Sequence, residues 1–295
     1  MINQITKDKI KKLFTLYRGL SKGRKNVLQE IAAAEIPEMV YNSNAIENST
    51  LTLEDTEDIL LRNRIKKDYS LREVFEAKNL AAITEILLKK PKEELTIKFI
   101  LFLHKILLTN IDDNIAGRFR SGNEWVRVGA HIGANPAFTN KLMSELVREY
   151  NVKNKTYFLD KTAHFHAEFE TIHPFCDGNG RIGRVLINQQ LMKIGYPPII
   201  VQNKSKHSDY YPLFDDYVTK NKYDGFTHNF ALLLMESLNK RISILSSGKI
   251  ISLSLWAKQN RIKGNIAVNK AIRQTIPAFR IRKKWMISKD FKESE

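Results

Sequence analysis

Apolar residues recur at helical spacing through most of the first 245 residues of this 295-residue chain. Four periodic segments stand out, at residues 96–108, 162–173, 181–194 and 226–245. The first, Thr96–Leu108, is apolar on nearly all faces, which predicts a central helix buried in a bundle. Phe165, Phe169 and Ile172 lie at helical spacing and offer a stripe to the same core. The pattern therefore predicts a mainly α fold.

One stretch breaks the helical pattern. Residues 124–132 (EWVRVGAHI) contain two short β-like runs around Gly129 and Ala130, which predicts a small hairpin. A lone hairpin has little structural purpose on a helical bundle, so we expect it to contact a ligand.

The pattern changes again near residue 248. Three short elements follow, namely helices over 250–259 and 266–274 and a strand pair over 279–287. This is the order of a winged helix-turn-helix, so we expect one domain over residues 1–245 and a second over residues 249–295. Residues 249–295 hold 12 Lys and Arg against 3 Asp and Glu, and so carry +9 of the net charge of +16. That density favours an anionic partner such as duplex DNA; the alternative is a charge that only keeps a small domain soluble.

Composition excludes other classes. No apolar run approaches the ~18–20 residues of a membrane span, and the amino terminus has no signal-peptide stretch. The single cysteine, Cys176, excludes an intrachain disulfide, so we expect a cytoplasmic protein.

The segment HPFCDGNGRIGR, which begins at His173, carries the candidate chemistry. A helix should end at His173, where a proline follows, and a new helix should begin near Arg181. Gly178 and Gly180 permit a tight turn with room for a ligand. The N–H groups at the new helix start form an anion site, and Arg181 and Arg184 share one helix face. These features predict a clamp for at least two phosphoryl groups.

Two further residues complete this segment. Asp177, beside bound phosphates, is the expected ligand of Mg²⁺, and His173 is a natural general base near neutral pH. The combination indicates phosphoryl or nucleotidyl transfer. A DGNG turn, a single histidine or two helical arginines would each have a purely structural explanation, but their conjunction within 12 residues argues against it.

The segment resembles the Fic-family motif, His-x-Phe-x-Asp/Glu-Gly-Asn-Gly-Arg-x-x-Arg, and matches every fixed position. Residues 115–120 resemble the stretch before the family's hairpin flap, and residues 126–132 resemble the flap. The resemblance covers about residues 30–245. It implies a Fic-type helical bundle and a protein adenylyltransferase, which transfers AMP from ATP to a Ser, Thr or Tyr hydroxyl of a target protein.

The resemblance also implies residue roles. His173 would deprotonate the hydroxyl, Phe175 would anchor the loop, and Asp177 would hold Mg²⁺ or Mn²⁺. The nucleotide would be bound by Asp177, Gly178, Asn179, Gly180, Arg181, Arg184, Tyr210 and Tyr211, although the two tyrosines have core packing as an alternative. The flap would pin the target by strand addition through Val128, Gly129, Ala130 and His131.

Ser43–Asn48 (SNAIEN) resembles the family's inhibitory motif, Ser/Thr-x-x-x-Glu-Gly/Asn. The resemblance implies that Ser43, Glu47 and Asn48 form a brake, in which Glu47 pairs with Arg184 and blocks the γ-phosphate of ATP. A carboxylate can compete with phosphate for a guanidinium group. The alternative is a solvated helix end.

Three residues of the sequence suggest other kinds of site. His164 and His166 near His173 suggest zinc, but they face different sides of a helix. Cys176 suggests a thiol nucleophile, but it occupies the family's variable position. The competing class is a DNA-binding regulator whose Fic domain senses a nucleotide; family members also remove AMP or use other donors. The target protein, which can be the chain itself, and a homodimer are left open.

Overall fold

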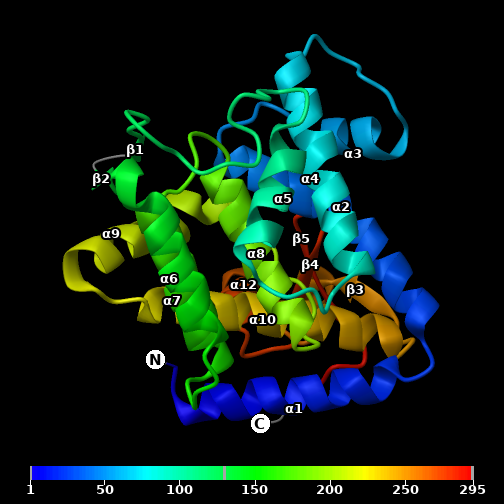
Figure 1. The fold of residues 1–295 in the computed structure, drawn as a ribbon. Coiled ribbons are helices and arrows are strands. Elements are labelled where there is room, and N and C mark those ends of the chain that lie inside the picture. Colours follow the sequence, from blue (N-terminus) through cyan, green and yellow to red (C-terminus); the bar gives the residue numbers. More distant parts are fainter. Residues whose placement is uncertain (1, 129–130, 294–295) are drawn as a thin grey trace. The chain divides into compact units, whose positions relative to one another are not determined.

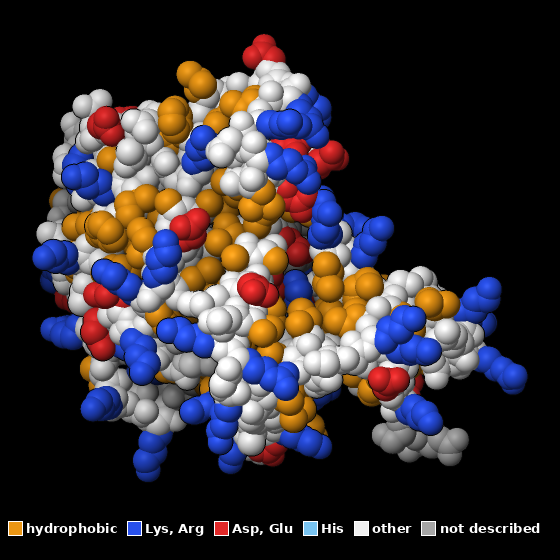
Figure 2. Space-filling view, turned by 90° about the vertical axis from the view of Figure 1, so that its right-hand side faces the viewer, with side chains coloured by type: hydrophobic (Ala, Val, Ile, Leu, Met, Phe, Trp, Pro, Cys, Tyr) orange, Lys and Arg blue, Asp and Glu red, His pale blue; other side chains and the backbone are white. Residues whose placement is uncertain are grey.

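A computed structural model describes residues 2–128 and 131–293 (Figure 1). The described residues divide into two compact units. The first comprises residues 33–196 and 200–227, and the second comprises residues 2–32, 197–199 and 228 onward. No helix in this described part of the chain is long and apolar enough to cross a membrane. The charged groups on the face shown in Figure 2 are mostly Lys and Arg, in keeping with the net charge of +16.

The first unit is a bundle of helices. It contains α3 (Leu53–Leu61), α4 (Leu71–Lys89), α5 (Ile97–Leu108), α6 (Thr139–Asn151), α7 (Phe158–Ile172), α8 (Asn179–Lys193), α9 (Tyr211–Lys220), most of α2 (Lys25–Ile46) and the start of α10 (Asp224–Leu245). Short turns of 3-10 helix (Pro136–Phe138, Asn203–Ser205) and π-helix (Lys206–Tyr210) join them. In Figure 1, α4 and α5 lie side by side, as do α6 and α7. The mainly helical prediction is confirmed.

Helix α5 supplies the centre of this core. The hydroxyl of Thr96 accepts the Phe99 N–H at 3.1 Å and so caps the helix start. Leu103 and Leu107 are fully buried. Phe102, however, is 48% exposed, so α5 is not enclosed on every face as its composition predicted. One face of the helix reaches the surface.

Helices α7 and α8 flank the motif loop. Helix α7 ends at Ile172, and His173 follows in the left-handed conformation with φ 50°. Gly178 precedes α8 with φ 81°, a conformation that favours glycine, and a Cβ there would lie 2.8 Å from Leu107 Cδ2. Helix α8 begins at Asn179, slightly before the predicted start. The loop is thus held between two buried helices.

The predicted hairpin is present. Strand β1 (Arg127–Val128) pairs antiparallel with β2 (His131–Ile132), with Arg127 opposite Ile132 and Val128 opposite His131. Gly129 and Ala130, which were expected at its turn, lie outside the described residues.

The second unit joins helices to a small antiparallel sheet. Its elements are α1 (Gln4–Ser21), the start of α2, the rest of α10, β3 (Ile250–Ser252), α11 (Leu253–Gln259), α12 (Gly264–Ile272), β4 (Phe279–Ile281) and β5 (Lys284–Ser288), with strand order β3-β5-β4. The helix predicted over 250–259 is wrong at its start, because Ile251 pairs with Ile287 and Ser252 caps α11. Trp256 is buried between these elements. The order of elements agrees with a winged helix-turn-helix.

Candidate active site

Asn179 fixes the shape of the motif loop. Its side-chain Oδ1 accepts the Phe175 N–H at 2.8 Å, and its Nδ2 donates to the Phe175 carbonyl oxygen at 2.8 Å. The residue is buried, and its amide satisfies backbone groups that the turn leaves unpaired. The side chain of Asn179, predicted as a nucleotide ligand, therefore shapes the loop from inside.

His104 of α5 packs against the motif loop and supports it. This role was not found from the sequence. Its ring stacks on the buried ring of Phe175, with centroids 3.7 Å apart. His104 Nδ1 accepts the Gly117 N–H at 3.0 Å, so the proton lies on Nε2, which donates to the Asp177 carbonyl oxygen at 3.0 Å. Burial lowers the pKa of His104 to about 4, which keeps the ring neutral. A histidine within a largely apolar segment was the available signal.

Arg120 fixes the backbone around His173. Its buried guanidinium donates to four backbone carbonyl oxygens, those of His173 (2.7 Å), Glu124 (2.9 Å), Ala134 (2.6 Å) and Ile172 (3.1 Å). Its own N–H donates to the Pro174 carbonyl oxygen at 2.9 Å. The sequence analysis noted this arginine only within the stretch before the flap. In the fold it joins that stretch to the end of α7.

His173 presents one ring nitrogen as a base. Its Nδ1 lies 3.3 Å from the Glu170 carbonyl oxygen and 3.8 Å from Glu170 Oε2, an arrangement that places the proton on Nδ1. Nε2 then carries the lone pair. Burial is the main reason that the pKa of His173 falls to about 4, with a smaller contribution from Arg120. The ring is therefore neutral near pH 7 and can accept a proton.

Glu170 is a buried acid behind this base. Its Oε1 has no hydrogen-bond partner among the described residues, and a Cβ at Gly183 would collide with the same oxygen. Burial raises the pKa of Glu170 to about 8, against the opposing effect of Arg184. A glycine at position 183 thus leaves room for this carboxyl group beside α8. The sequence did not reveal this residue, because only the apolar positions of this helix follow a recognisable spacing.

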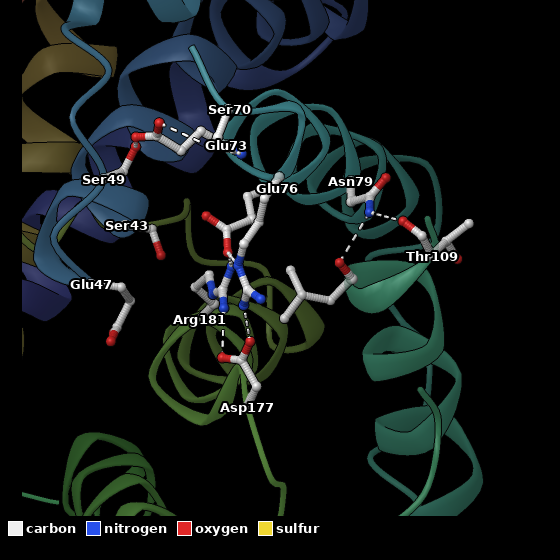
Figure 3. A network of polar contacts seen from close by, with 12 residues as sticks. Ser43, Glu47, Ser49, Ser70, Glu73, Glu76, Asn79, Thr109, Asp177 and Arg181 are labelled. Carbon is white, nitrogen blue, oxygen red and sulfur yellow. Dashed lines mark hydrogen bonds and ion pairs between the residues drawn. The ribbon is translucent and has the colours of Figure 1, made fainter. Parts of the chain in front are cut away.

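Asp177 is held by two arginines. Its Oδ1 accepts from Arg181 Nη2 at 2.9 Å, and its Oδ2 pairs with Arg72 of α4. Arg181 Nη1 also pairs with Glu76 at 2.8 Å, an arrangement seen beside Asp177 in Figure 3. Burial opposes ionisation of Asp177, but Arg181 and Arg72 together hold its pKa below the ordinary value. Neither Arg72 nor Glu76 was found from the sequence.

The donor set at Asp177 fits a divalent cation that arrives with a nucleotide. The described residues contain no group of three or more His, Cys, Asp or Glu side chains that could hold a metal alone. Mg²⁺ commonly takes only one or two carboxylates, together with phosphate oxygens and water. Asp177 is 31% exposed and faces two cationic groups, so it offers one such carboxylate.

Arg184 meets the Ser43–Asn48 segment, as predicted. Its Nε donates to Ser43 Oγ at 3.0 Å, and its Nη2 donates to the Ser43 carbonyl oxygen at 2.8 Å and to Glu47 Oε1 at 2.7 Å. Burial opposes the charge on Arg184, but Glu47 raises the pKa of the guanidinium above its ordinary value. A Cβ at Gly180 would collide with the Glu47 carboxylate. Glycine is therefore needed at position 180 for this contact.

The two tyrosines pack against the same region. Tyr210 is buried, and its hydroxyl lies 2.7 Å from His166 Nε2. The Tyr211 hydroxyl donates to the Ile46 carbonyl oxygen at 2.8 Å. Lys206 donates to Asn48 Oδ1 at 2.9 Å, and Asn48 itself has φ 68°. Residues 206–211 thus close over the end of α2.

The flap is tied to the end of α7. His131 Nε2 lies 3.1 Å from the Thr171 carbonyl oxygen. Trp125 is 55% exposed and Ile132 is 50% exposed, so the base of the hairpin presents apolar groups outward. Val128 lies in β1 at the register given above.

The part of the chain that contains the motif loop is similar to known proteins. Residues 94–191 match the family model described as Fic/DOC family. A Fic-domain-containing signalling protein from Bacteroides thetaiotaomicron has a similar solved structure, with a TM-score of 0.73 and 27% identity, covering 82% of this chain and 98% of that one. A Fic-1 fragment from C. elegans has a TM-score of 0.69 and 25% identity, covering 81% of this chain and 71% of that one.

Curated relatives carry the name protein adenylyltransferase Fic. The Aedes aegypti protein is 34% identical over 176 residues, which are 58% of this chain and 35% of that protein. The Drosophila melanogaster protein is 35% identical over 176 residues, with the same coverage of each chain. The chain thus spans about a third of the length of the curated relatives it matches.

Proposed function

We propose that this chain, of which residues 94–191 match the Fic/DOC family model, is a protein adenylyltransferase that transfers AMP from ATP to a Ser, Thr or Tyr hydroxyl of a target protein. One observation carries the proposal. A neutral His173, with Nε2 available as base, lies beside a helix start that bears Arg181 and Arg184. The name shared by the curated relatives supports the same activity.

His173 and the arginines divide the chemistry. His173 Nε2 takes the proton of the target hydroxyl as its oxygen attacks the α-phosphorus of ATP. The bond from that phosphorus to the β-phosphate bridging oxygen breaks, and pyrophosphate leaves. Arg181, Arg184 and the N–H groups at the start of α8 stabilise the negative charge on the phosphates. Mg²⁺ or Mn²⁺, held by Asp177 and phosphate oxygens, would supply further positive charge there.

In this proposal, Glu47 inhibits the transfer of AMP. Its carboxylate occupies the Arg184 guanidinium that a γ-phosphate would need, at 2.7 Å. A phosphate and a carboxylate compete for the same donors. The resting chain is therefore auto-inhibited.

The first test determines which group is transferred. The Glu47→Gly variant is incubated with a candidate protein, or alone, and with ATP labelled at either the α- or the γ-phosphate. Protein should gain the α-label and not the γ-label, and mass spectrometry should find AMP on a hydroxyl side chain. Transfer from another nucleotide, or AMP removal from a pre-modified protein, would favour those alternative activities. Absence of any transfer by folded protein would contradict the proposal.

The second candidate function is duplex DNA binding by residues 249–295, alongside or instead of catalysis. The turn between β4 and β5 bears Arg282 and Lys283, both exposed, and Arg273 of the preceding segment is also exposed. Two other basic residues of this segment form ion pairs, Arg280 with Glu236 and Lys270 with Glu293. The exposure of Arg282 and Lys283 makes the turn a candidate for the contact with DNA.

A salt titration tests this second function. Affinity for random duplex should fall steeply with added salt, and the Arg282→Ala, Lys283→Ala double variant should bind more weakly with a shallower salt slope. Lack of binding at ~50 mM salt would instead favour a protein-docking role for this segment. The unpaired thiol of Cys176 supports a reducing compartment such as the cytoplasm for either function.

A further inference from the structure

Four side chains form a closed ring of alternating charge at the motif loop. Asp177 pairs with Arg181 and with Arg72, and Glu76 pairs with Arg181 at 2.8 Å and with Arg72 Nε at 3.1 Å. Figure 3 shows Asp177, Arg181 and Glu76 at the core of this network. Two of the four residues, Arg72 and Glu76, come from α4 and lie outside the family motif. The ring links the expected cation ligand to a helix with no assigned part in the site.

The members of the ring differ greatly in burial. The side chain of Arg181 is 4% exposed and that of Glu76 is 13% exposed, whereas that of Arg72 is 52% exposed. A buried pair is costly to break when one charge is left behind. An exposed pair contributes little and exchanges easily with water or another ion. The contact between Arg72 and Asp177 is therefore the weakest side of the ring.

The same contact covers the oxygen that a cation would need. Asp177 has one oxygen on the buried Arg181 and the other on Arg72. Metal binding at the second oxygen requires only that the exposed guanidinium move away. Arg72 keeps a partner when it moves, because its Nε contact with Glu76 does not involve Asp177. The ring can thus open at one side while Arg181 stays in place.

We propose that Arg72 occupies the divalent-cation position at Asp177 in the resting chain and competes with Mg²⁺ for that carboxylate. The inference rests on the proposed function, since the phosphates of ATP complete the cation's ligands. Arg72 sets how much Mg²⁺ the nucleotide site requires. This control is separate from that of Glu47, which acts on Arg184.

Calorimetric titration of ATP at a series of Mg²⁺ concentrations tests the competition. All proteins carry Glu47→Gly, so that the brake does not limit binding. Arg72→Ala should lower the Mg²⁺ concentration that gives half-maximal ATP affinity by about two- to fivefold, the range for a partly exposed ion pair. Lys78→Ala is the matched control, because Lys78 is an exposed cation on the same helix. It should leave the Mg²⁺ requirement unchanged.

Asp177→Asn provides the second check. In a protein that carries Asp177→Asn, adding Arg72→Ala should no longer alter the Mg²⁺ dependence of ATP binding, because the carboxylate for which Arg72 and Mg²⁺ compete is gone. The inference is overturned by an unchanged or higher Mg²⁺ requirement in Arg72→Ala, or by an effect that persists with Asp177→Asn. If no protein binds ATP at saturating Mg²⁺ while thermal melts show an intact fold, the proposed function itself fails.

Discussion

His173 derives its chemistry from its neighbours. The Glu170 carbonyl oxygen directs Nδ1, and Arg120 holds the His173 carbonyl oxygen at 2.7 Å. Together they leave Nε2 as the one ring nitrogen that can act as a base. Burial lowers the pKa of the ring to about 4, so no proton must be removed before catalysis. The same residue on an open helix end would titrate near 6.5.

Replacement of His173 tests the base directly. His173→Ala should lower the rate of AMP transfer by ~10²–10⁴, the usual contribution of a general base. ATP affinity should be retained, because the phosphate clamp lies on α8. The transfer rate and a calorimetric ATP titration are measured in the Glu47→Gly background. His164→Ala serves as control, because His164 is a partly exposed histidine of the preceding helix, α7. Full activity of His173→Ala would remove it from this role.

The pH dependence of transfer tests its protonation. Since the pKa of His173 is about 4, the rate of Glu47→Gly should stay level as pH falls from 7 to about 5.5. It should decline only as pH approaches 4. Glu170, whose pKa is about 8, lies beside the same ring, which also interacts with Arg120, Glu47 and His131. Glu170→Gln therefore separates any change at alkaline pH from the titration of His173. A midpoint near 6.5 would contradict the lowered pKa.

At the level of elements, the sequence predicted the motif loop and its two helices, because local signals define them. Proline after His173 ends α7, and glycines at 178 and 180 permit the turn. Arg72 and Glu76 could not be found in this way. They lie about 100 residues before the loop on a helix whose charges suggest a solvated face. Only the packing of α4 beside α8 brings them to Asp177.

The contact between the end of α2 and α8 allows the proposed inhibitory role of Glu47 to be tested. Glu47 and Arg184 are 137 positions apart and meet at 2.7 Å. Glu47→Gly should raise AMP transfer, including modification of the chain itself, because Arg184 becomes available to the γ-phosphate. Stability should fall moderately, because Arg184 is only 7% exposed and loses its charged partner, although it keeps its two hydrogen bonds to Ser43.

Two further variants test how the charge and the size of the Glu47 side chain each contribute to the inhibition of AMP transfer. Glu47→Gln keeps the side-chain size and removes its charge, so it should raise transfer less than Glu47→Gly. Adding Arg184→Ala to Glu47→Gly should erase the gain, because the clamp is then missing. An unchanged or lower rate in folded Glu47→Gly would leave Ser43–Asn48 as an ordinary helix end.

At the level of the whole molecule, the first unit depends on buried and partly buried histidines that stay uncharged. Burial lowers the pKa to about 4 for His104 and His173 and to about 3 for His166. Each lies in or beside the motif loop or the Tyr210 contact. Glu170 is held protonated among them, with a pKa of about 8. The residues that shape the site therefore also make the stability of the fold depend on pH.

The direction of this dependence follows from proton counting. Between pH 6.5 and about 4, these histidines are protonated in the unfolded chain but remain neutral in the folded chain. The free energy of unfolding therefore falls as pH falls, by about 1.4 kcal/mol per pH unit for each proton. Glu170 acts oppositely. Its folded pKa of about 8 exceeds the ordinary 4.5, so it reduces stability as pH rises through that window. The two effects partly cancel between pH 4.5 and 6.5.

The Glu170→Gln variant separates the effect of Glu170 on the pH dependence of stability from that of the histidines. Urea unfolding of wild type and variant is measured from pH 4.5 to 8. The variant should gain stability relative to wild type as pH rises, because the buried acid no longer resists ionisation. Its acid-induced loss below pH 6.5 should also be steeper, because only the histidines then titrate. A variant whose stability is flat from pH 6.5 to 4.5 would mean that these histidines accept protons in the folded state. The lowered pKa of His173, and with it a base that is neutral at rest, would then be wrong.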